Sequence, residues 1–155
     1  MNIQEFKDAM ARWASGVAIL STLMNNKPVG ITVIGFMSLS VDPPSILISI
    51  DRKSYMVEAI KGTRKFAVTF LNEGQKEISR LFASNDSDKF RNEWTEYKNE
   101  LPYVKGNVTL FAELQSELNA VDHVLFIGKV NDIIINEGNP LIYWNRMYLK
   151  LNITE

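Results

Sequence analysis

The central part of the sequence, Val29 to Ser54, contains two strand-like runs separated by Asp42-Pro43-Pro44. Proline lacks an amide hydrogen and has a fixed φ angle, so these prolines should stop the strand ladder and force a corner. The first run, Val29 to Leu39, mixes threonine, serine and glycine with its apolar residues. Because a glycine within a strand often marks a bulge or a close approach to a ligand, we predict that this run lines a binding site.

The second run, Ser45 to Ile50, leads into a segment typical of a short helix. Ser54 can cap the helix, Tyr55 to Lys61 can form it, and Gly62 can end it. The free amides of the helix start, the Ser54 hydroxyl and the two cations at positions 52 and 53 together favour an anion such as a phosphate. The same residues also describe a solvated turn with an ordinary helix cap, and such short motifs often match by chance.

The remaining chain contains several β-type runs at short spacing and few helical segments. Helical spacing is found near Ile3 to Trp13 and at Gln75 to Phe82, in addition to the central helix. The strand-like runs are Val17 to Leu23, Lys65 to Leu71, Leu110 to Leu118, Val124 to Ile135, Leu141 to Trp144 and Tyr148-Leu149. This pattern favours a mainly β barrel over a doubly wound α/β fold, and no Gly-x-Gly-x-x-Gly motif indicates a Rossmann-type domain. We expect one domain, residues 1–155.

Composition excludes several classes of function. A formal net charge of −1 and a pI of about 5.9 give no excess of positive charge for nucleic acid or an anionic membrane. The absence of cysteine excludes disulfides and thiolate metal sites, and a single histidine, His123, excludes a histidine metal cluster. No apolar run approaches the ~20 residues that cross a bilayer, and the first residues lack a signal-peptide pattern, so we expect a soluble cytoplasmic protein.

An ordered series of short segments resembles the flavin reductase family of the FMN-binding split-barrel fold, in particular the small reductase components of two-component flavin monooxygenases. These segments are Phe6, Ser15-Gly16-Val17, Gly30-Ile31-Thr32-Val33, Phe36, Ser38-Leu39-Ser40, Asp42-Pro43-Pro44, Ser54, Phe66-Ala67-Val68, Gln75, Phe82-Ala83, Phe90, Asp122-His123, Gly128 and Pro140-Leu141. The resemblance implies a split β-barrel with peripheral helices. It also implies a homodimer with flavin sites near the subunit interface.

The resemblance further implies which residues meet the ligands. The expected flavin contacts are Thr32, Val33, Ile34, Gly35, Ser49, Ile50, Asp51, Arg52, Lys53, Ser54, Ala83 and Lys89, and the expected nicotinamide contacts are His123, Tyr143 and Arg146. The chain departs from the family pattern at Ile34-Gly35, where an Asn-Ser pair is common, at Lys89, often an arginine, and at Val121, often a glycine.

Each of these side chains also has an ordinary structural interpretation. Lys89 reads equally as a surface lysine in an acidic loop, and Ala83 as a small residue at a helix end. His123 beside Asp122 reads as a structural histidine at a strand start, whereas Tyr143 and Arg146 read as part of an aromatic strand with an exposed arginine.

The function implied is that of an NAD(P)H:flavin oxidoreductase. NADH or NADPH would pass a hydride from nicotinamide C4 to N5 of FMN or FAD, and the reduced flavin would serve a separate monooxygenase acting on an aromatic compound such as 4-hydroxyphenylacetate. Because the cofactors supply the chemistry, the protein needs no acid–base dyad. The alternatives are an FMN-dependent oxidase of the pyridoxamine-phosphate type and a non-catalytic flavin-binding protein.

Overall fold

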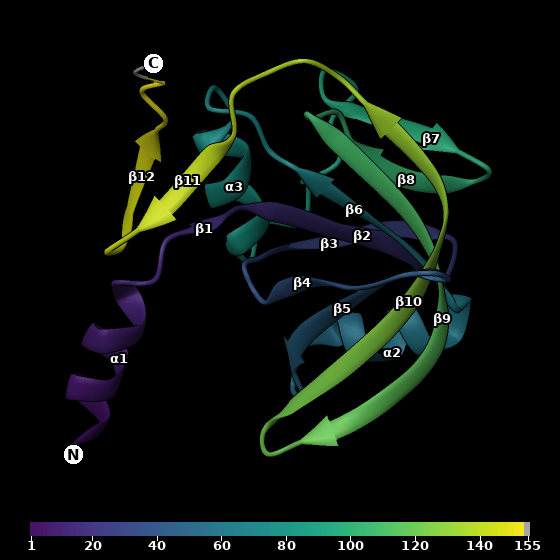
Figure 1. Ribbon diagram of the computed structural model, residues 1–155. Coiled ribbons are helices and arrows are strands. Elements are labelled where there is room, and N and C mark those ends of the chain that lie inside the picture. Colours follow the sequence, from purple (N-terminus) through teal and green to yellow (C-terminus); the bar gives the residue numbers. More distant parts are fainter. Residues whose placement is uncertain (154–155) are drawn as a thin grey trace.

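The computed structural model describes residues 1–153 and shows a curled antiparallel sheet with helices at its periphery (Figure 1). The helices are α1 (Ile3–Ala11), α2 (Tyr55–Thr63) and α3 (Lys76–Ala83). The strands are β1 (Ser15–Gly16), β2 (Ala18–Met24), β3 (Lys27–Val33), β4 (Phe36–Val41), β5 (Pro44–Asp51), β6 (Lys65–Phe70), β7 (Thr95–Lys98), β8 (Leu101–Val104), β9 (Val108–Ala120), β10 (His123–Ile135), β11 (Leu141–Trp144) and β12 (Met147–Lys150).

The main sheet has the strand order β3-β2-β6-β9-β10-β5-β4. Its two edge strands, β3 and β4, follow each other in the chain and are joined only by Ile34 and Gly35. The sheet therefore curls until its edges come together. The Ser49 amide of β5 donates to the Gly35 carbonyl (2.8 Å) and so continues the β4–β5 ladder by one residue before Phe36. The predicted mainly β split barrel with peripheral helices is confirmed.

The barrel interior is filled by large apolar side chains from alternating positions of its strands. Leu20, Ile48, Phe66 and Phe126 are fully buried, and α2 closes one side by adding Met56, Val57 and Ile60 to the same cluster. This core fixes the start of α2 beside the end of β5. A smaller sheet, β1-β11-β12, packs with α3 around a second apolar cluster outside the barrel.

The central stretch differs from the sequence expectation in two respects. Val29 to Leu39 is not one strand, because the chain leaves β3 at Val33 and starts β4 at Phe36 on the opposite edge of the sheet. The prolines do form a corner, but only Pro43 lies in the turn. Pro44 pairs with Val41, so the ladder resumes there, as a first strand residue can be a proline without loss of a needed amide.

Several element boundaries also differ. Helix α2 ends at Thr63 rather than at Gly62, because Arg64 adopts the left-handed conformation (φ 57°) and its amide donates to Ile60 O. Helix α1 ends at Ala11, before the Trp13 that the helical spacing includes, and Ser15-Gly16 pairs with β11. The hairpin of β7 and β8 was not predicted.

Candidate functional site

An open groove of about 530 Å³ lies along the outer edge of β3. Its other walls are the end of β5, the first residues of α2 and the end of α3 with the loop that follows. The lining residues are Ile31, Thr32, Val33, Ile34, Gly35, Ser49, Ile50, Asp51, Ser54, Tyr55, Phe82, Ala83, Ser84, Asn85, Lys89 and His123. The groove combines an apolar wall with polar groups at its ends, as small-molecule sites commonly do.

The β3 wall presents backbone groups to the groove. Because β3 is an edge strand, half of its amides and carbonyls point away from β2. The Gly30 carbonyl is one of these, since it accepts from the Tyr55 hydroxyl (2.9 Å) and from Lys89 Nζ (3.4 Å). Backbone direction alternates along a strand, so the amide and carbonyl of Thr32 also face the groove. The Thr32 hydroxyl donates to Ser79 O (2.5 Å) and fastens β3 to α3.

The start of α2 forms one end of the groove. Ser54 caps the helix by accepting from the Met56 amide (3.3 Å). Two hydrogen bonds hold the turn before the helix. The Lys53 amide donates to Asp51 Oδ1 (2.8 Å), and the Ser54 amide donates to Asp51 O (2.9 Å). The positive end of the helix dipole therefore faces the same space as Ser54 and Tyr55.

Lys89 brings a buried positive charge to the groove. Its residue is only 7% exposed, and Nζ donates to Phe82 O (3.1 Å) and Gly30 O (3.4 Å). An ammonium group has three N–H donors. Two of them are taken up by the acceptors found among the described residues, so the third N–H can donate to a ligand. Burial lowers the pKa of Lys89, and the negative charge of Asp86 partly opposes that shift.

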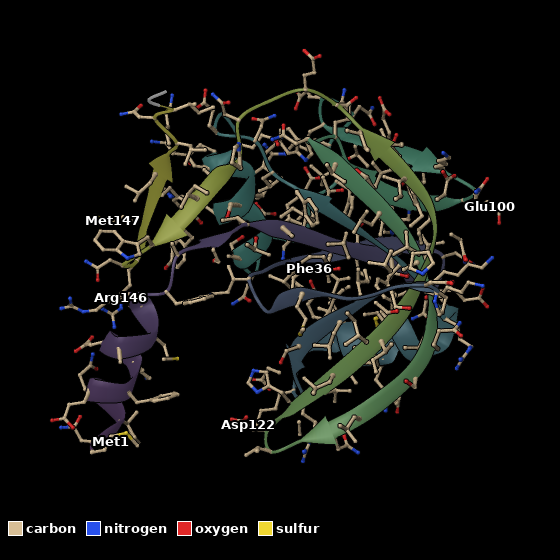
Figure 2. The ribbon with its side chains drawn as sticks, in the orientation of Figure 1. Met1, Phe36, Glu100, Asp122, Arg146 and Met147 are labelled. Atoms are coloured by element: carbon tan, nitrogen blue, oxygen red, sulfur yellow. The ribbon has the colours of Figure 1, made fainter. Side chains whose placement is uncertain are left out.

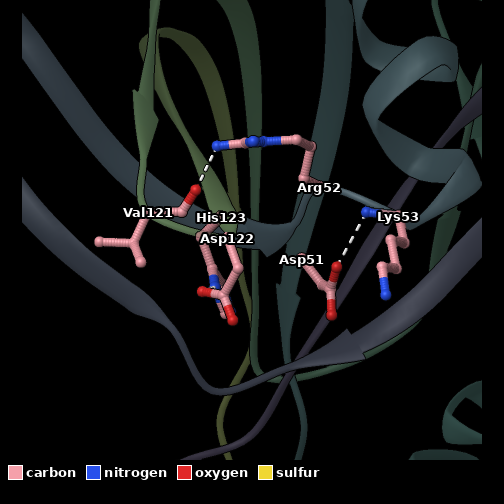
Figure 3. Close-up of polar contacts among 6 residues, drawn as sticks. All are labelled: Asp51, Arg52, Lys53, Val121, Asp122 and His123. Carbon is pink, nitrogen blue, oxygen red and sulfur yellow. Dashed lines mark hydrogen bonds and ion pairs between the residues drawn. The ribbon is translucent and has the colours of Figure 1, made fainter.

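Beside the turn that leads from β5 into α2, His123 and Asp122 form a pair (Figure 3). His123 lies opposite Asp51 in the β10–β5 ladder, and its Nδ1 is 2.7 Å from Asp122 Oδ1. This hydrogen bond lowers the pKa of Asp122. With Nδ1 engaged, Nε2 of His123 is the nitrogen left to meet a ligand.

The comparison with known proteins decides the family. A family model described as "Flavin reductase like domain" matches residues 10–152. The chain belongs to this family. The resemblance inferred from the short sequence segments is thereby confirmed.

Related proteins and solved structures match over nearly the whole chain. The reductase component of 4-hydroxyphenylacetate 3-monooxygenase from Thermus thermophilus is 31% identical over an alignment of 153 residues that covers 96% of this chain and 96% of the relative. An NADH-dependent flavin reductase from a Rhodococcus species is 29% identical, over 95% of this chain and 85% of the relative. The solved structure of the flavin reductase PheA2 has a TM-score of 0.91 at 34% identity and covers 99% of this chain and 100% of that one.

For this flavin reductase family member, the structure brings most of the predicted site residues together. The groove is lined by Thr32, Val33, Ile34, Gly35, Ser49, Ile50, Asp51, Ser54, Ala83, Lys89 and His123. Their assignment to flavin or nicotinamide stays a prediction, which the geometry accommodates. The surface-lysine interpretation of Lys89 is wrong, because the side chain is buried between β3 and α3.

Four predicted residues do not line the groove. The Arg52 guanidinium reaches over to the Val121 carbonyl, and Lys53 is exposed (Figure 3). Tyr143 packs against Tyr148 in the outer cluster, with ring centroids 5.4 Å apart. Arg146 forms an ion pair with Asp8 of α1 (2.6 Å) and lies beside that helix (Figure 2). In a single chain, Lys89 rather than Arg52 or Lys53 is the cation that lines the groove.

Sequence reasoning missed five groove residues, Ile31, Tyr55, Phe82, Ser84 and Asn85. Tyr55 directly follows Ser54, the predicted helix cap, so its place in the sequence could have indicated that it lines the same site. Ser84 and Asn85 follow Ala83 directly, but their composition indicated only an exposed loop.

The described part of the chain contains no cluster of three or more metal-ligating side chains. In residues 1–153, every helix is also too short or too polar to traverse a bilayer.

Proposed function

We propose that the protein reduces flavin with NADH or NADPH and supplies the reduced flavin to a separate monooxygenase. The observation that carries this proposal is the groove, which joins the outward backbone edge of β3 to the buried cation of Lys89 in a chain of the flavin reductase family. When bound, the two ligands supply the chemistry, since flavin accepts at N5 a hydride from C4 of the nicotinamide.

The residues present fit a phosphorylated flavin. Ile31, Val33, Ile34 and Phe82 give the groove apolar surface for a flat ring system. The outward amide and carbonyl of Thr32 can hydrogen-bond the polar edge of such a ring. Backbone groups also take over the role of the side chains that are missing at Ile34 and Gly35, where the family commonly has an Asn-Ser pair.

The phosphate end is assigned to Lys89 and the start of α2. Lys89 has a third N–H to donate, and Ser54 stands at the positive end of the helix dipole. Lysine binds a phosphate as a point charge and does not form the bidentate hydrogen bonds of arginine. Such a contact suits a flavin that is exchanged between turnovers.

The nicotinamide contact is assigned to His123. Asp122 holds the imidazole ring in place, so Nε2 is oriented without a further contact. Tyr143 and Arg146 remain proposed as dinucleotide contacts, although in one chain they face the outer cluster and α1. The protein's task is to align two rings, so the groove needs no acid–base pair at the reacting atoms.

The proposed monooxygenase partner follows from the relatives. The Thermus thermophilus relative is named as a reductase component, and a relative from Rhodococcus opacus is the reductase component of a 4-nitrophenol monooxygenase. We accordingly propose that the partner hydroxylates an aromatic compound such as 4-hydroxyphenylacetate. The open groove allows reduced flavin to leave for that partner.

A homodimer is also proposed, because α1 carries an apolar side that one chain leaves uncovered. Phe6 is 52%, Met10 54% and the adjoining Trp13 79% exposed, and α1 has no buried residue among those described. Hydrogen bonds from Asn145 and Arg146 tie α1 to the rest of the chain, and Trp144 donates to the carbonyl of Arg12, which directly follows the helix. The edge strand β4 exposes Met37, Leu39 and Val41 in the same way. Amphipathic faces of this kind are normally covered by a partner.

The proposal is tested by mixing the purified protein with NADH and free flavin and following the nicotinamide absorbance. Without dioxygen, which would reoxidise the reduced flavin, we expect one NADH to be consumed per flavin supplied, and an added monooxygenase component to take up the reduced flavin. Flavin binding without NADH consumption would indicate a binding protein. Turnover of pyridoxamine phosphate without use of NADH would indicate the oxidase.

A further inference from the structure

Helix α3 supplies one wall of the groove and also fixes the groove's cation. Phe82 and Ala83, at the end of the helix, line the groove. The Phe82 carbonyl accepts from Lys89 Nζ (3.1 Å). The position of α3 relative to β3 therefore determines both the width of the groove and the place of the buried charge.

Ser79, in the middle of α3, is held by two strands that lie far apart in the sequence. Its carbonyl accepts from the Thr32 hydroxyl of β3 (2.5 Å), and its own hydroxyl is 2.7 Å from the hydroxyl of Tyr148 in β12. Ser79 is fully buried, and a buried hydroxyl without a partner costs free energy. Among the described residues, Tyr148 is the partner of this hydroxyl, so α3 is fastened to β12 as well as to β3.

Tyr148 is itself held in place. Its ring packs against Tyr143, the residue opposite it in the β11–β12 ladder, and the Arg80 guanidinium lies over the ring, 5.5 Å from its centroid. Strand β11 is anchored in turn, because the Leu141 amide donates to Leu71 O (3.0 Å). The Tyr148 hydroxyl is therefore a fixed support for α3, and the hairpin that carries it lies beside that helix (Figure 1).

We propose that Tyr148 is a positioning residue for flavin binding. It does not line the groove and acts through Ser79. The pair of hydroxyls holds α3 against β3, and so keeps Ala83 and the carbonyl that fixes Lys89 in place before flavin arrives. A site that is already ordered loses less entropy when its ligand enters. This inference rests on the proposed function, because it concerns the flavin site along β3.

The test compares Tyr148→Phe with the unaltered protein, both full-length and flavin-free. The variant loses only the hydroxyl, so the packing of the ring against Tyr143 and Arg80 stays. Quenching of flavin fluorescence, well below the melting temperature, should show FMN bound about fivefold more weakly, the effect of one ordinary hydrogen bond. In steady-state assays with NADH, the KM for FMN should rise by the same factor, while kcat at saturating FMN should stay within about twofold.

A second variant and a control make the test specific. Ser79→Ala removes the same hydrogen bond from the other side and leaves the carbonyl of residue 79 to accept from Thr32. The double variant should therefore bind FMN about as weakly as either single variant, whereas independent effects would multiply to roughly 25-fold. Tyr97→Phe makes the same chemical change at an exposed tyrosine of β7 that does not line the groove, so it should leave the FMN affinity unchanged.

Two results would overturn the inference. One is an unchanged FMN affinity in Tyr148→Phe, whatever its melting temperature, since a purely structural contact would lower the melting temperature alone. The other is a multiplied loss of affinity in the double variant. An unaltered protein that binds no flavin would instead refute the proposed function, and the inference with it.

Discussion

At the scale of single residues, Lys89 is the side chain on which the phosphate assignment depends. Replacing it by methionine preserves the aliphatic stem but removes the ammonium that donates to Gly30 O and Phe82 O. A hydrogen bond to a charged group contributes about 1.5–3 kcal/mol, so Lys89→Met should weaken FMN binding roughly 10- to 100-fold. Riboflavin, which lacks the phosphate, should be affected much less. Equal loss of both ligands would show that Lys89 acts through the shape of the groove.

The charge of Lys89 also predicts a pH dependence. Burial lowers its pKa below the ordinary value of 10.5, against the opposing effect of Asp86. The cation is present below that lowered pKa and lost above it, so the preference for FMN over riboflavin should decline as the pH rises through it. Fluorescence titrations from about pH 7.5 upward, where the phosphate is already a dianion, measure this preference. In Lys89→Met the preference should be flat over the same range.

Val121 has a left-handed backbone conformation that is unfavourable for a β-branched residue. It sits at the tip of the β9–β10 hairpin with φ 56° and is 93% exposed. The left-handed region costs an L residue about 1–2 kcal/mol, and glycine avoids this cost at a smaller entropic one, so Val121→Gly should stabilise the fold by about 0.5–1 kcal/mol. A thermal melt should show a rise of about 1–4 °C. Val41→Gly, at an equally exposed strand position, should lower the melting temperature.

The types and order of the residues in the sequence indicated where the binding groove lies, but they did not indicate which positively charged side chains line it. Arg52 and Lys53 stand next to a capped helix start and were therefore natural phosphate ligands. The β9–β10 turn brings the Val121 carbonyl within reach of Arg52, a contact between residues 69 apart in the chain. Lys89 is buried because Phe82, 7 residues before it, and Gly30, 59 residues before it, both offer it carbonyls. Neither contact has a signature in the local sequence.

At the scale of elements, the β9–β10 pairing beside the bulge at Gln115 of β9 depends on a glycine of β10. The β9–β10 register shifts between Ile127 and Gly128, and a Cβ at Gly128 would lie 2.5 Å from Cζ of the fully buried Phe66. Because that ring is packed on all sides, Gly128→Ala should destabilise the fold by about 1–3 kcal/mol in denaturant unfolding. Gly62→Ala is the matched control, since nothing lies within 4 Å of its Cβ position in α2. It should stabilise by up to about 1 kcal/mol, and equal effects of the two variants would contradict the packing argument.

Element types were readable from periodicity, whereas strand breaks were not. The sequence from Val29 to Leu39 has continuous β character, yet β3 and β4 lie on opposite edges of the sheet. The break at Ile34-Gly35 arises because the chain crosses there from one edge of the sheet to the other, and Gly35, whose carbonyl accepts from Ser49 of β5, already belongs to the β4 side. The short hairpin of β7 and β8 was missed for a related reason. Its Thr95–Lys98 strand is polar, and it is held by pairing with Leu101–Val104 rather than by an apolar pattern of its own.

At the scale of the whole molecule, α1 stands apart from the barrel in Figure 1, and its apolar side calls for a second copy. Met10→Glu places a charge in the centre of that side. If α1 packs against a partner, this variant should elute with the mass of one chain, 17.7 kDa, in size-exclusion chromatography with light scattering, whereas the unaltered protein should show twice that mass. Arg12→Gln is the control, because it changes the net charge by the same amount as Met10→Glu but lies on the side away from Met10. It should therefore leave the dimer intact. A single-chain mass for the unaltered protein would refute the homodimer, and the flavin affinities of such a monomer would then describe the complete site.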